Sequence, residues 1–539
     1  MFVFWWVEVR RFWVPAVDEF PLLVSSAATF HPHPLHWLTQ GYSKYFVVYP
    51  ELTNGQTNFL RPVGNLFYFV SSLLCGQHWV GYLLCAYMVY ALLAAGTVWI
   101  AVRYFGFSAL QVTVLGVLLF FTPAQDPLAH LYPDGALDLL GATLLMWSLA
   151  FLFKRRLGMA FVLCTAAVFT KETTHFAPFA MCVCLYLFSP RPLSAKVKAY
   201  LCAFPLPVIA LYTLRRMDFR SNGGVYATGG ISLRSAAKSV LRWPLHIFVD
   251  DAHPARRGVV IGLERYGLVA CCALFWVLLL GAGVPLLLRA YRAKERVVVE
   301  AEAPVGTAIF FLAGALCLPV LLGLTARFGA LVFPLLALLG IYFVGVSGES
   351  WRRYGWAVCV VALAVVSVQA RLGVFASMQS NQKFWEGERG YLEAIQGAPA
   401  GVLLSVDDRN GGTTVRWLQA FTRYSGVFVP VDRLMPLGPA CWQFSKVERT
   451  SAEELRVEFP YKSECQKAVL EGTNKAQPAE WSTATGPVTV TYFSDGKAQL
   501  QYARVRVPAG IAVSVLEPVP YTNRYRVVDA ASLPDSVSK

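Results

Sequence analysis

The amino-acid sequence predicts a polytopic α-helical membrane protein of about 10–12 spans, followed by a soluble C-terminal domain of α+β or mostly-β class. Hydrophobic residues make up 56% of the 539 residues and charged residues only 15%, whereas about a quarter of a soluble domain is charged. Apolar runs that are long enough to cross a bilayer recur as far as residue 370. Beyond them, charged residues become common and short alternating runs predict strands. We therefore expect a transmembrane domain over residues 1–375 and an extracytoplasmic soluble domain over residues 376–539.

The chain opens with an aromatic, apolar segment, residues 1–17, that is too short and too charged for a good span. It is either an interfacial helix or the tail of a first span, and it lacks the pattern of a signal peptide. A polar, aromatic loop begins at the acidic pair Asp18-Glu19 and ends near Arg61-Pro62. Because charge at the edge of the hydrocarbon is expensive, it tends to be kept for function. The pair therefore either carries chemistry or lies inert in interfacial water.

The predicted spans follow this loop, after a half-buried lead-in at residues 66–74. They cover residues 78–102, 109–122, 137–153, 158–170, 176–188, 199–214, 266–288, 307–324, 330–346 and 356–370. Short basic clusters occupy every second connection: Arg103, Lys154–Arg156, Arg191–Lys198, Arg289–Arg296 and Arg352–Arg353. By the positive-inside rule these connections face the cytoplasm, so the Asp18 loop, the alternate connections and the C-terminal domain face outward. The same pattern accounts for the net charge of +14, so we expect no nucleic-acid partner.

Three polar features lie outside the spans: a long basic loop, two C-terminal cysteines and a segment with two histidines. The long outward loop from Arg215 to Glu264 is basic and glycine-rich. It is either a movable lid for an anionic lipid head group or an amphipathic helix on the membrane. The two cysteines of the polar C-terminal part, Cys441 and Cys465, could form a disulfide outside the cytoplasm, whereas the other ten of the 12 lie in apolar runs. The segment around His31 and His33 has no carboxylate nearby in sequence, so we predict no metal site there and leave a divalent cofactor open.

The C-terminal domain shows the alternating pattern of strands. They are predicted at residues 402–406, 427–431, 488–493, 499–507 and 512–515, with turns rich in Gly, Asp and Pro between them. No nucleophile elbow, phosphate loop or metal motif occurs in this domain. We therefore expect it to recognise an acceptor or a partner protein.

The outward connections gather the polar side chains that could carry chemistry. They are Asp18, Glu19, Arg61, Asp126, His130, Asp134, Lys171, Glu172, His175 and Arg327. A carboxylate base can take a proton from an acceptor hydroxyl or amine, while cations stabilise a phosphate that leaves the carbon under attack. The sequence contains neither a phosphate loop nor a dinucleotide-binding glycine fingerprint, so we expect a lipid-borne donor.

Five short motifs resemble those of the GT-C glycosyltransferases, in the branch that contains protein O-mannosyltransferases and the aminoarabinose transferase of lipid A. They are Asp18-Glu19, Phe59–Val63 (FLRPV), Tyr132–Asp138 (YPDGALD), Phe169–Thr173 (FTKET) with Pro178, and Ala326–Phe328 (ARF) with Pro334. The resemblance covers residues 15 to 375. The chain departs from the family in its short first segment and in the displaced proline after the last motif.

By this resemblance Asp18 is the general base, and Glu19 orients it or binds the acceptor. The donor polyprenyl phosphate is held by Arg61, Lys171 and Arg327. Glu172 positions Lys171 or takes part in a divalent-ion site, and Asp134 and His175 support the site. Three of these assignments have a structural alternative: a helix-end ion pair for Lys171-Glu172, an interfacial anchor for Arg327, and an N-cap for Asp134.

The function implied is that of an inverting glycosyltransferase, which moves a sugar from a polyprenyl-phosphate donor in the lipid bilayer to an extracytoplasmic glycan, lipid or protein. The expected location is a bacterial inner membrane. A flippase or other transporter for lipid-linked sugars is one alternative, but the spans are nearly free of the charge that a transport path would need. A non-catalytic membrane scaffold is the other.

Overall fold

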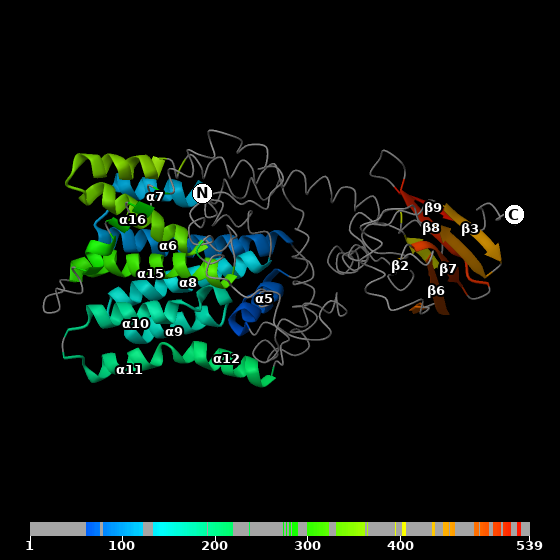
Figure 1. Ribbon diagram of the computed structural model, residues 1–539, viewed down its shortest axis with the longest axis horizontal. Coiled ribbons are helices and arrows are strands. Elements are labelled where there is room, and N and C mark those ends of the chain that lie inside the picture. Colours follow the sequence, from blue (N-terminus) through cyan, green and yellow to red (C-terminus); the bar gives the residue numbers. More distant parts are fainter. Residues whose placement is uncertain are drawn as a thin grey trace. The chain divides into compact units, whose positions relative to one another are not determined.

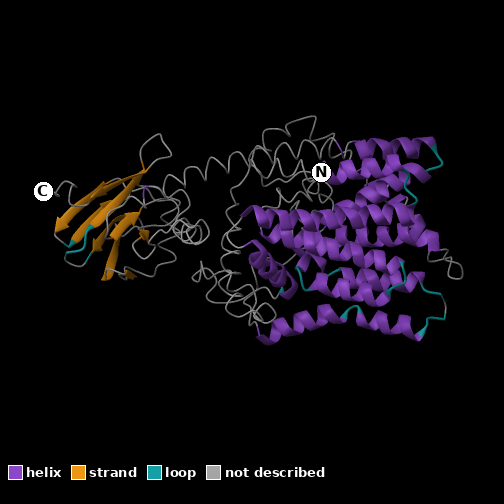
Figure 2. Ribbon diagram, turned by 180° about the vertical axis from the view of Figure 1, so that it is seen from behind, coloured by secondary structure: helices purple, strands orange, loops and turns teal. Residues whose placement is uncertain are grey.

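The computed structural model divides into two compact units, Met1–Gln379 and Ser380–Lys539. In the first unit it describes residues 61–75, 79–121, 133–190, 192–218, 299–322 and 330–361, with isolated positions between 237 and 288 and at 364. In the second unit it describes residues 402–405, 434–436, 446–451, 453–458, 479–483, 486–494, 500–507, 510–518 and 525–529, with position 394. Figures 1 and 2 show that the described elements of the first unit are helices and those of the second are strands. The predicted fold class, a helical membrane domain followed by a strand-rich domain, is confirmed.

The helices of the first unit coincide with the predicted spans. They are α5 (Pro62–Cys75), α6 (Trp79–Phe105), α7 (Ala109–Phe121), α8 (Pro133–Phe153), α9 (Leu157–Val168), α10 (Ala177–Phe188), α11 (Ala195–Ala203), α12 (Leu206–Asp218), α15 (Val299–Leu322) and α16 (Val332–Val346). A short 3-10 turn, η2 (Glu172–Thr174), joins α9 to α10. Long runs of Leu, Val and Ala favour helix because in a bilayer each backbone group must be satisfied within its own segment.

Three stretches of described helix are long and apolar enough to cross a membrane: Leu84–Phe105, Ala136–Phe153 and Ala195–Thr213. The other apolar helices that the structure describes are shorter. Large apolar side chains such as Met88, Val162 and Phe179 remain exposed on the outer faces, where lipid tails would cover them. The buried core joins α6, α8, α9, α10, α15 and α16. The total of 10–12 spans stays a prediction.

Local chemistry sets several helix ends. Gly106 has φ +65 directly after α6, a conformation that glycine adopts without steric strain. The next helix starts with a capping box, because the Ser108 backbone N–H donates to Gln111 Oε1 at 2.9 Å and the Gln111 N–H donates back to Ser108 Oγ at 3.4 Å. Ser194 caps α11 by accepting from the Val197 N–H.

Three sequence-based assignments need correction. The span predicted at 199–214 overlaps the apolar helical stretch Ala195–Thr213, but this stretch is interrupted, because α11 ends at Ala203 and α12 begins at Leu206. The cause is Pro205, which has no N–H to donate back along the helix. The lead-in predicted at 66–74 is α5, which starts earlier, at Pro62, a favoured residue for the first helical position. Asp134 is the second residue of α8 rather than the capping residue before it.

The connections after α6, α8 and α10, as far as the structure describes them, lie at one end of the helical unit (Figure 1). The Tyr104 and Phe153 rings meet at 5.4 Å, so the last turns of α6 and α8 are neighbours. Arg155 donates to the Phe188 carbonyl at the end of α10. These ends carry Arg103 and the cluster Lys154–Arg156, which share one end of the bundle as the positive-inside pattern predicts.

The described strands of the second unit form two sheets. Its strands are β1 (Val402–Ser405), β2 (Leu434–Pro436), β3 (Lys446–Ser451), β4 (Glu454–Glu458), β5 (Ala479–Thr483), β6 (Gly486–Ser494), β7 (Leu500–Arg506), β8 (Val513–Pro518) and β9 (Tyr525–Asp529). One sheet has the order β2-β1-β8-β9, in which β1 is parallel to both β2 and β8. The other is antiparallel with the order β3-β4-β7-β6-β5. Strands predicted near β1, β6, β7 and β8 are confirmed, and the strand predicted at 427–431 lies outside the described residues.

Candidate functional site

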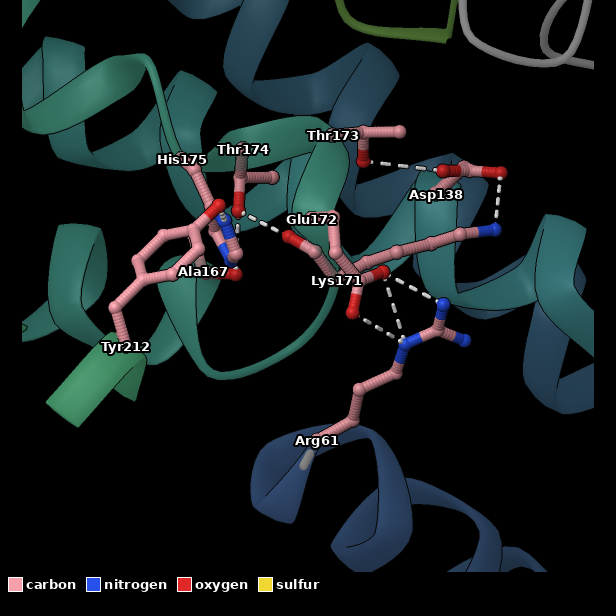
Figure 3. Close-up of polar contacts among 9 residues, drawn as sticks. All are labelled: Arg61, Asp138, Ala167, Lys171, Glu172, Thr173, Thr174, His175 and Tyr212. Carbon is pink, nitrogen blue, oxygen red and sulfur yellow. Dashed lines mark hydrogen bonds and ion pairs between the residues drawn. The ribbon is translucent and has the colours of Figure 1, made fainter. Parts of the chain in front are cut away.

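The first charged pair of the candidate site joins the start of α5 to the turn η2. Arg61 immediately precedes α5, and its Nη2 lies 2.6 Å from Glu172 Oε2. The guanidinium Nε also donates to both oxygens of Glu172, at 3.2 and 3.1 Å. Arg61 is 3% exposed and Glu172 is 14% exposed. Because two N–H groups converge on one carboxylate, the pair fixes both the position and the plane of the guanidinium (Figure 3).

The second charged pair joins the same turn to α8. Lys171 Nζ donates to Asp138 Oδ2 at 2.8 Å, and the two side chains are 4% and 2% exposed. The other oxygen of Asp138 accepts from Thr173 Oγ1 at 3.1 Å. Water cannot solvate charges at this depth, so the contact between the two groups offsets part of the free energy lost when they leave water. The turn therefore brings Lys171 and Thr173 onto one carboxylate (Figure 3).

Hydrogen bonds to the backbone hold the turn that carries these residues. Thr174 Oγ1 lies 2.7 Å from the Ala167 carbonyl and 2.7 Å from the Lys171 carbonyl, so its O–H is shared between them. The Val63 N–H donates to the Phe169 carbonyl at 3.1 Å, which ties α5 to the end of α9. A β-carbon at Gly141 of α8 would lie 2.8 Å from Thr174 Cγ2. The close approach of α8 to the turn thus requires glycine at this position.

His175 extends the polar cluster toward α12. Its Nδ1 and the Tyr212 hydroxyl are 3.4 Å apart, and the two rings meet edge to face with centroids 5.6 Å apart. His175 is buried, and it follows directly after η2. One four-residue segment, 171–174, together with His175, thus links α5, α8, α9 and α12 at a single corner of the helical unit.

The cluster lies at the end of the bundle opposite the basic connections. Thr143 Oγ1 donates to the Val89 carbonyl and Trp147 Nε1 to the Leu92 carbonyl, so α6 and α8 run side by side in the same direction. Asp138 precedes these contacts in α8, whereas Lys154 follows them. The charged cluster and the basic end are therefore separated by most of the length of α8.

The structure brings together four residues of the predicted site: Arg61, Lys171, Glu172 and His175. The adjacent residues Lys171 and Glu172 contact different partners, Asp138 and Arg61. Of the others, Asp134 lies in the first turn of α8, and Asp18, Glu19 and Arg327 lie outside the described residues. Their roles stay predictions, as does the disulfide between Cys441 and Cys465, which are also outside the described residues.

Sequence reasoning gave no role to three members of the cluster: Asp138 and Thr173, which end two of the quoted motifs, and Tyr212. A signal for Asp138 was present, because it is a carboxylate inside the otherwise apolar stretch Ala136–Phe153, and buried charge in a span tends to be functional. Tyr212 had no such signal. Within the residues that the structure describes, no group of three or more His, Cys, Asp or Glu side chains could hold a metal ion.

Comparison with known proteins gives one structural match. No protein-family model matches the chain, and no curated protein matches it either. Among solved structures, the chain is similar to ArnT from Cupriavidus metallidurans in the apo state, with 15% sequence identity and a TM-score of 0.44. The similarity covers 78% of this chain and 85% of that one.

Proposed function

We propose that this protein is a membrane glycosyltransferase that moves a sugar from a polyprenyl-phosphate donor to an acceptor outside the cytoplasm. The observation that carries the proposal is the buried cluster of two cations and two carboxylates at the bundle end opposite the basic connections. Burying four charges costs free energy that a purely structural core would avoid with apolar residues. The five sequence motifs, which include Arg61, Lys171 and Glu172, support the same function.

Arg61 and Lys171 suit the phosphate of the donor. The planar guanidinium matches the geometry of phosphate oxygens, and the ammonium acts as a compact point charge. Their carboxylate partners fix both groups before the donor arrives, so little conformational entropy is lost on binding. Of the four side chains, Glu172 is the most exposed, at 14%. Arg327 is proposed as a third cation.

The proposed reaction is a direct displacement at the anomeric carbon. An acceptor hydroxyl or amine loses its proton to the Asp18 carboxylate as it forms a bond to this carbon. The bond between the carbon and the phosphate oxygen breaks, and its electron pair remains on the phosphate, where the cations stabilise it. Attack from the face opposite the leaving group inverts the configuration. Glu19, Asp134 and His175 are proposed to support these groups, and the C-terminal unit to recognise the acceptor.

We propose that the charged cluster faces outward in a bacterial inner membrane. Exposed Arg103, Lys154 and Arg156 lie at the other end of the bundle, which the positive-inside rule assigns to the cytoplasm. The donor sugar would then be presented on the outer leaflet. This location also suits an acceptor in the cell envelope.

The experiment is to incubate the purified protein, in lipid nanodiscs, with a panel of radiolabelled polyprenyl-phosphate sugars and membrane extract. The inactive control is the double variant Asp138→Asn/Lys171→Met, which removes the cation together with the carboxylate that it contacts. We expect the wild type to consume one donor and the variant to be about 100-fold slower or worse, as when one charge-stabilising group is removed from an active site. Failure of the wild type to consume any donor would contradict the proposal, as would equal consumption by the wild type and the variant.

A further inference from the structure

Two thiols face each other where α5 meets α6. Cys75 is the last residue of α5, and Cys85 lies in the second turn of α6. Their Sγ atoms are 3.8 Å apart, and both residues are partly exposed. We propose that Cys75 and Cys85 form an oxidative modification site that closes into a disulfide on the outward side of the membrane domain. The proposal is independent of the glycosyltransferase function.

A glycine makes the approach of the two thiols possible. A β-carbon at Gly81 would lie 2.6 Å from Cys75 Sγ and 2.8 Å from Cys75 Cβ. Real β-carbons do not come this close to another atom, so any other residue at position 81 would push Cys75 away from the helix. Glycine is also an unfavourable residue inside a helix, by about 1 kcal/mol relative to alanine. Its presence in the first turn of α6 therefore fits a close contact with Cys75.

The position of Cys85 along α6 places the pair at the end that carries the charged cluster. The contacts of Thr143 with Val89 and of Trp147 with Leu92 align α6 with α8. Cys85 lies four residues before Val89, and Leu139, next to Asp138, lies four residues before Thr143. Cys85 is therefore at the level of Asp138. It is 18 residues from Arg103, or about 27 Å along the helix, close to the thickness of the hydrocarbon core.

This placement decides the redox environment of the pair. Arg103 lies at the basic end of the bundle, which faces the cytoplasm by the positive-inside rule. The thiols at the other end then face the compartment outside the cytoplasm, where disulfides form and persist. Cys164 and Cys184, in contrast, are buried in the core and pack as small hydrophobic residues.

The oxidant for this reaction is the disulfide of a dithiol–disulfide oxidoreductase in that compartment. One thiolate of the pair attacks a sulfur of the oxidised carrier and forms a mixed disulfide. The second thiolate then attacks this intermediate, forms the Cys75–Cys85 bond and releases the carrier as a dithiol. Two protons leave the protein thiols, and two electrons pass to the carrier. Because a sulfur–sulfur bond is about 2.05 Å long, the side chains must rotate to close the remaining distance.

The disulfide would fix the second end of α5. The first end is already tied to α9, because the Val63 N–H donates to the Phe169 carbonyl, and Arg61 contacts Glu172. A bond from Cys75 to α6 would leave α5 anchored at both ends. The modification therefore stabilises the helix whose start carries Arg61.

The test counts oxidised thiols in the full-length protein. Free thiols are blocked with N-ethylmaleimide in intact cells, disulfides are then reduced, and the released thiols are tagged with a maleimide–polyethylene glycol that shifts the protein on a gel. We expect Cys75→Ser and Cys85→Ser each to lose two tags relative to the wild type, because each change frees the partner thiol for blocking. Cys202→Ser, which changes an exposed cysteine of α11, should lose none. Equal tag numbers in the wild type and in both serine variants would overturn the proposal.

Mass spectrometry of the unreduced wild type gives the same answer without a substitution. Trypsin leaves both cysteines in one peptide, because no Lys or Arg lies between residues 62 and 102, so chymotrypsin is used. We expect a linked peptide pair that joins Cys75 to Cys85, and linkage of Cys75 to any other cysteine would overturn the assignment.

Gly81→Ala should reduce the linked fraction, whereas Gly116→Ala, where a β-carbon meets nothing within 4 Å, should not. An unchanged linked fraction in Gly81→Ala would contradict the role given to the glycine.

Discussion

Lys171 Nζ lies 2.8 Å from Asp138 Oδ2, although the two residues are 33 positions apart in the sequence and both are buried in the helical unit. The pair joins the turn after α9 to the first part of α8. Its neighbour, the pair of Arg61 and Glu172, joins the same turn to α5. The turn therefore depends on two buried ion pairs, and the first predictions concern what happens when one charge is removed.

Asp138→Asn should strongly destabilise the helical unit. The change removes the carboxylate charge that Lys171 Nζ contacts, and breaking a buried pair by removing one charge costs about 3–5 kcal/mol. Asp138→Asn/Lys171→Met should recover much of the loss, because neither residue is then charged. The apparent melting temperature in detergent is compared for the wild type, the single variant and the double variant. Glu349→Gln is the control, since Glu349 pairs with Arg352 at the exposed surface. A single variant as stable as the wild type would mean that the pair does not exist in solution.

Arg61→Lys should be a damaging change although it keeps the charge. Lysine cannot reproduce the two converging N–H groups that Arg61 offers to Glu172, and a lost hydrogen bond to a charged group costs roughly 1.5–3 kcal/mol. The loss is read from the apparent melting temperature. Arg353→Lys serves as the control, because Arg353 is exposed and donates to a backbone carbonyl. If Arg61→Lys had the same apparent melting temperature as Arg353→Lys, the two converging N–H groups of Arg61 would contribute nothing to stability.

Gly141→Ala should displace the turn η2, because the added methyl group would lie 2.8 Å from Thr174 Cγ2. Overpacking of this kind costs about 1–3 kcal/mol. Thr174→Ser removes the obstructing methyl group but keeps the hydroxyl that bonds to Ala167 and Lys171. The double variant Gly141→Ala/Thr174→Ser should therefore be more stable than Gly141→Ala alone. Additive destabilisation of the two changes would show that the two positions do not touch.

Cysteine labelling tests the sidedness of the helical unit. In a cysteine-free background, Ala195→Cys at the start of α11 should react with a membrane-impermeant maleimide only after the cells are opened. Asn54→Cys, in the first outward loop of the prediction, should react in intact cells. The physical reason is the cluster of basic residues at the α11 end of the bundle, which the positive-inside rule places in the cytoplasm. The reverse labelling pattern would place the charged cluster on the wrong side for an extracytoplasmic acceptor.

Local sequence patterns predicted most helices and some of the strands. The apolar runs of α6, α7, α8, α10 and α16 are nearly uninterrupted, so their hydrophobicity alone identified them. Strands β3 (KVERTS) and β4 (ELRVE) were missed because their charged residues hide the alternation. The break between α11 and α12 had a local signal in Pro205, which the apolarity of the surrounding run obscured.

The pairings of the candidate site could not be read from the sequence. Lys171 and Glu172 are adjacent, and local reasoning could only pair them with each other. Their partners lie 33 and 111 residues away, and only packing of α8 and α5 against the turn brings these groups together. Residue types and motif order nevertheless indicated four of the residues that now meet: Arg61, Lys171, Glu172 and His175.

The most direct test of the central claim compares Asp18→Asn with the wild type, once a lipid-phosphate sugar donor has been identified. The assay measures donor binding and sugar transfer separately, with Glu51→Gln as a control carboxylate from the same loop. If Asp18 is the base, the variant should bind the donor as the wild type does and transfer sugar about 100-fold more slowly or worse. Transfer by Asp18→Asn at the wild-type rate would contradict the account.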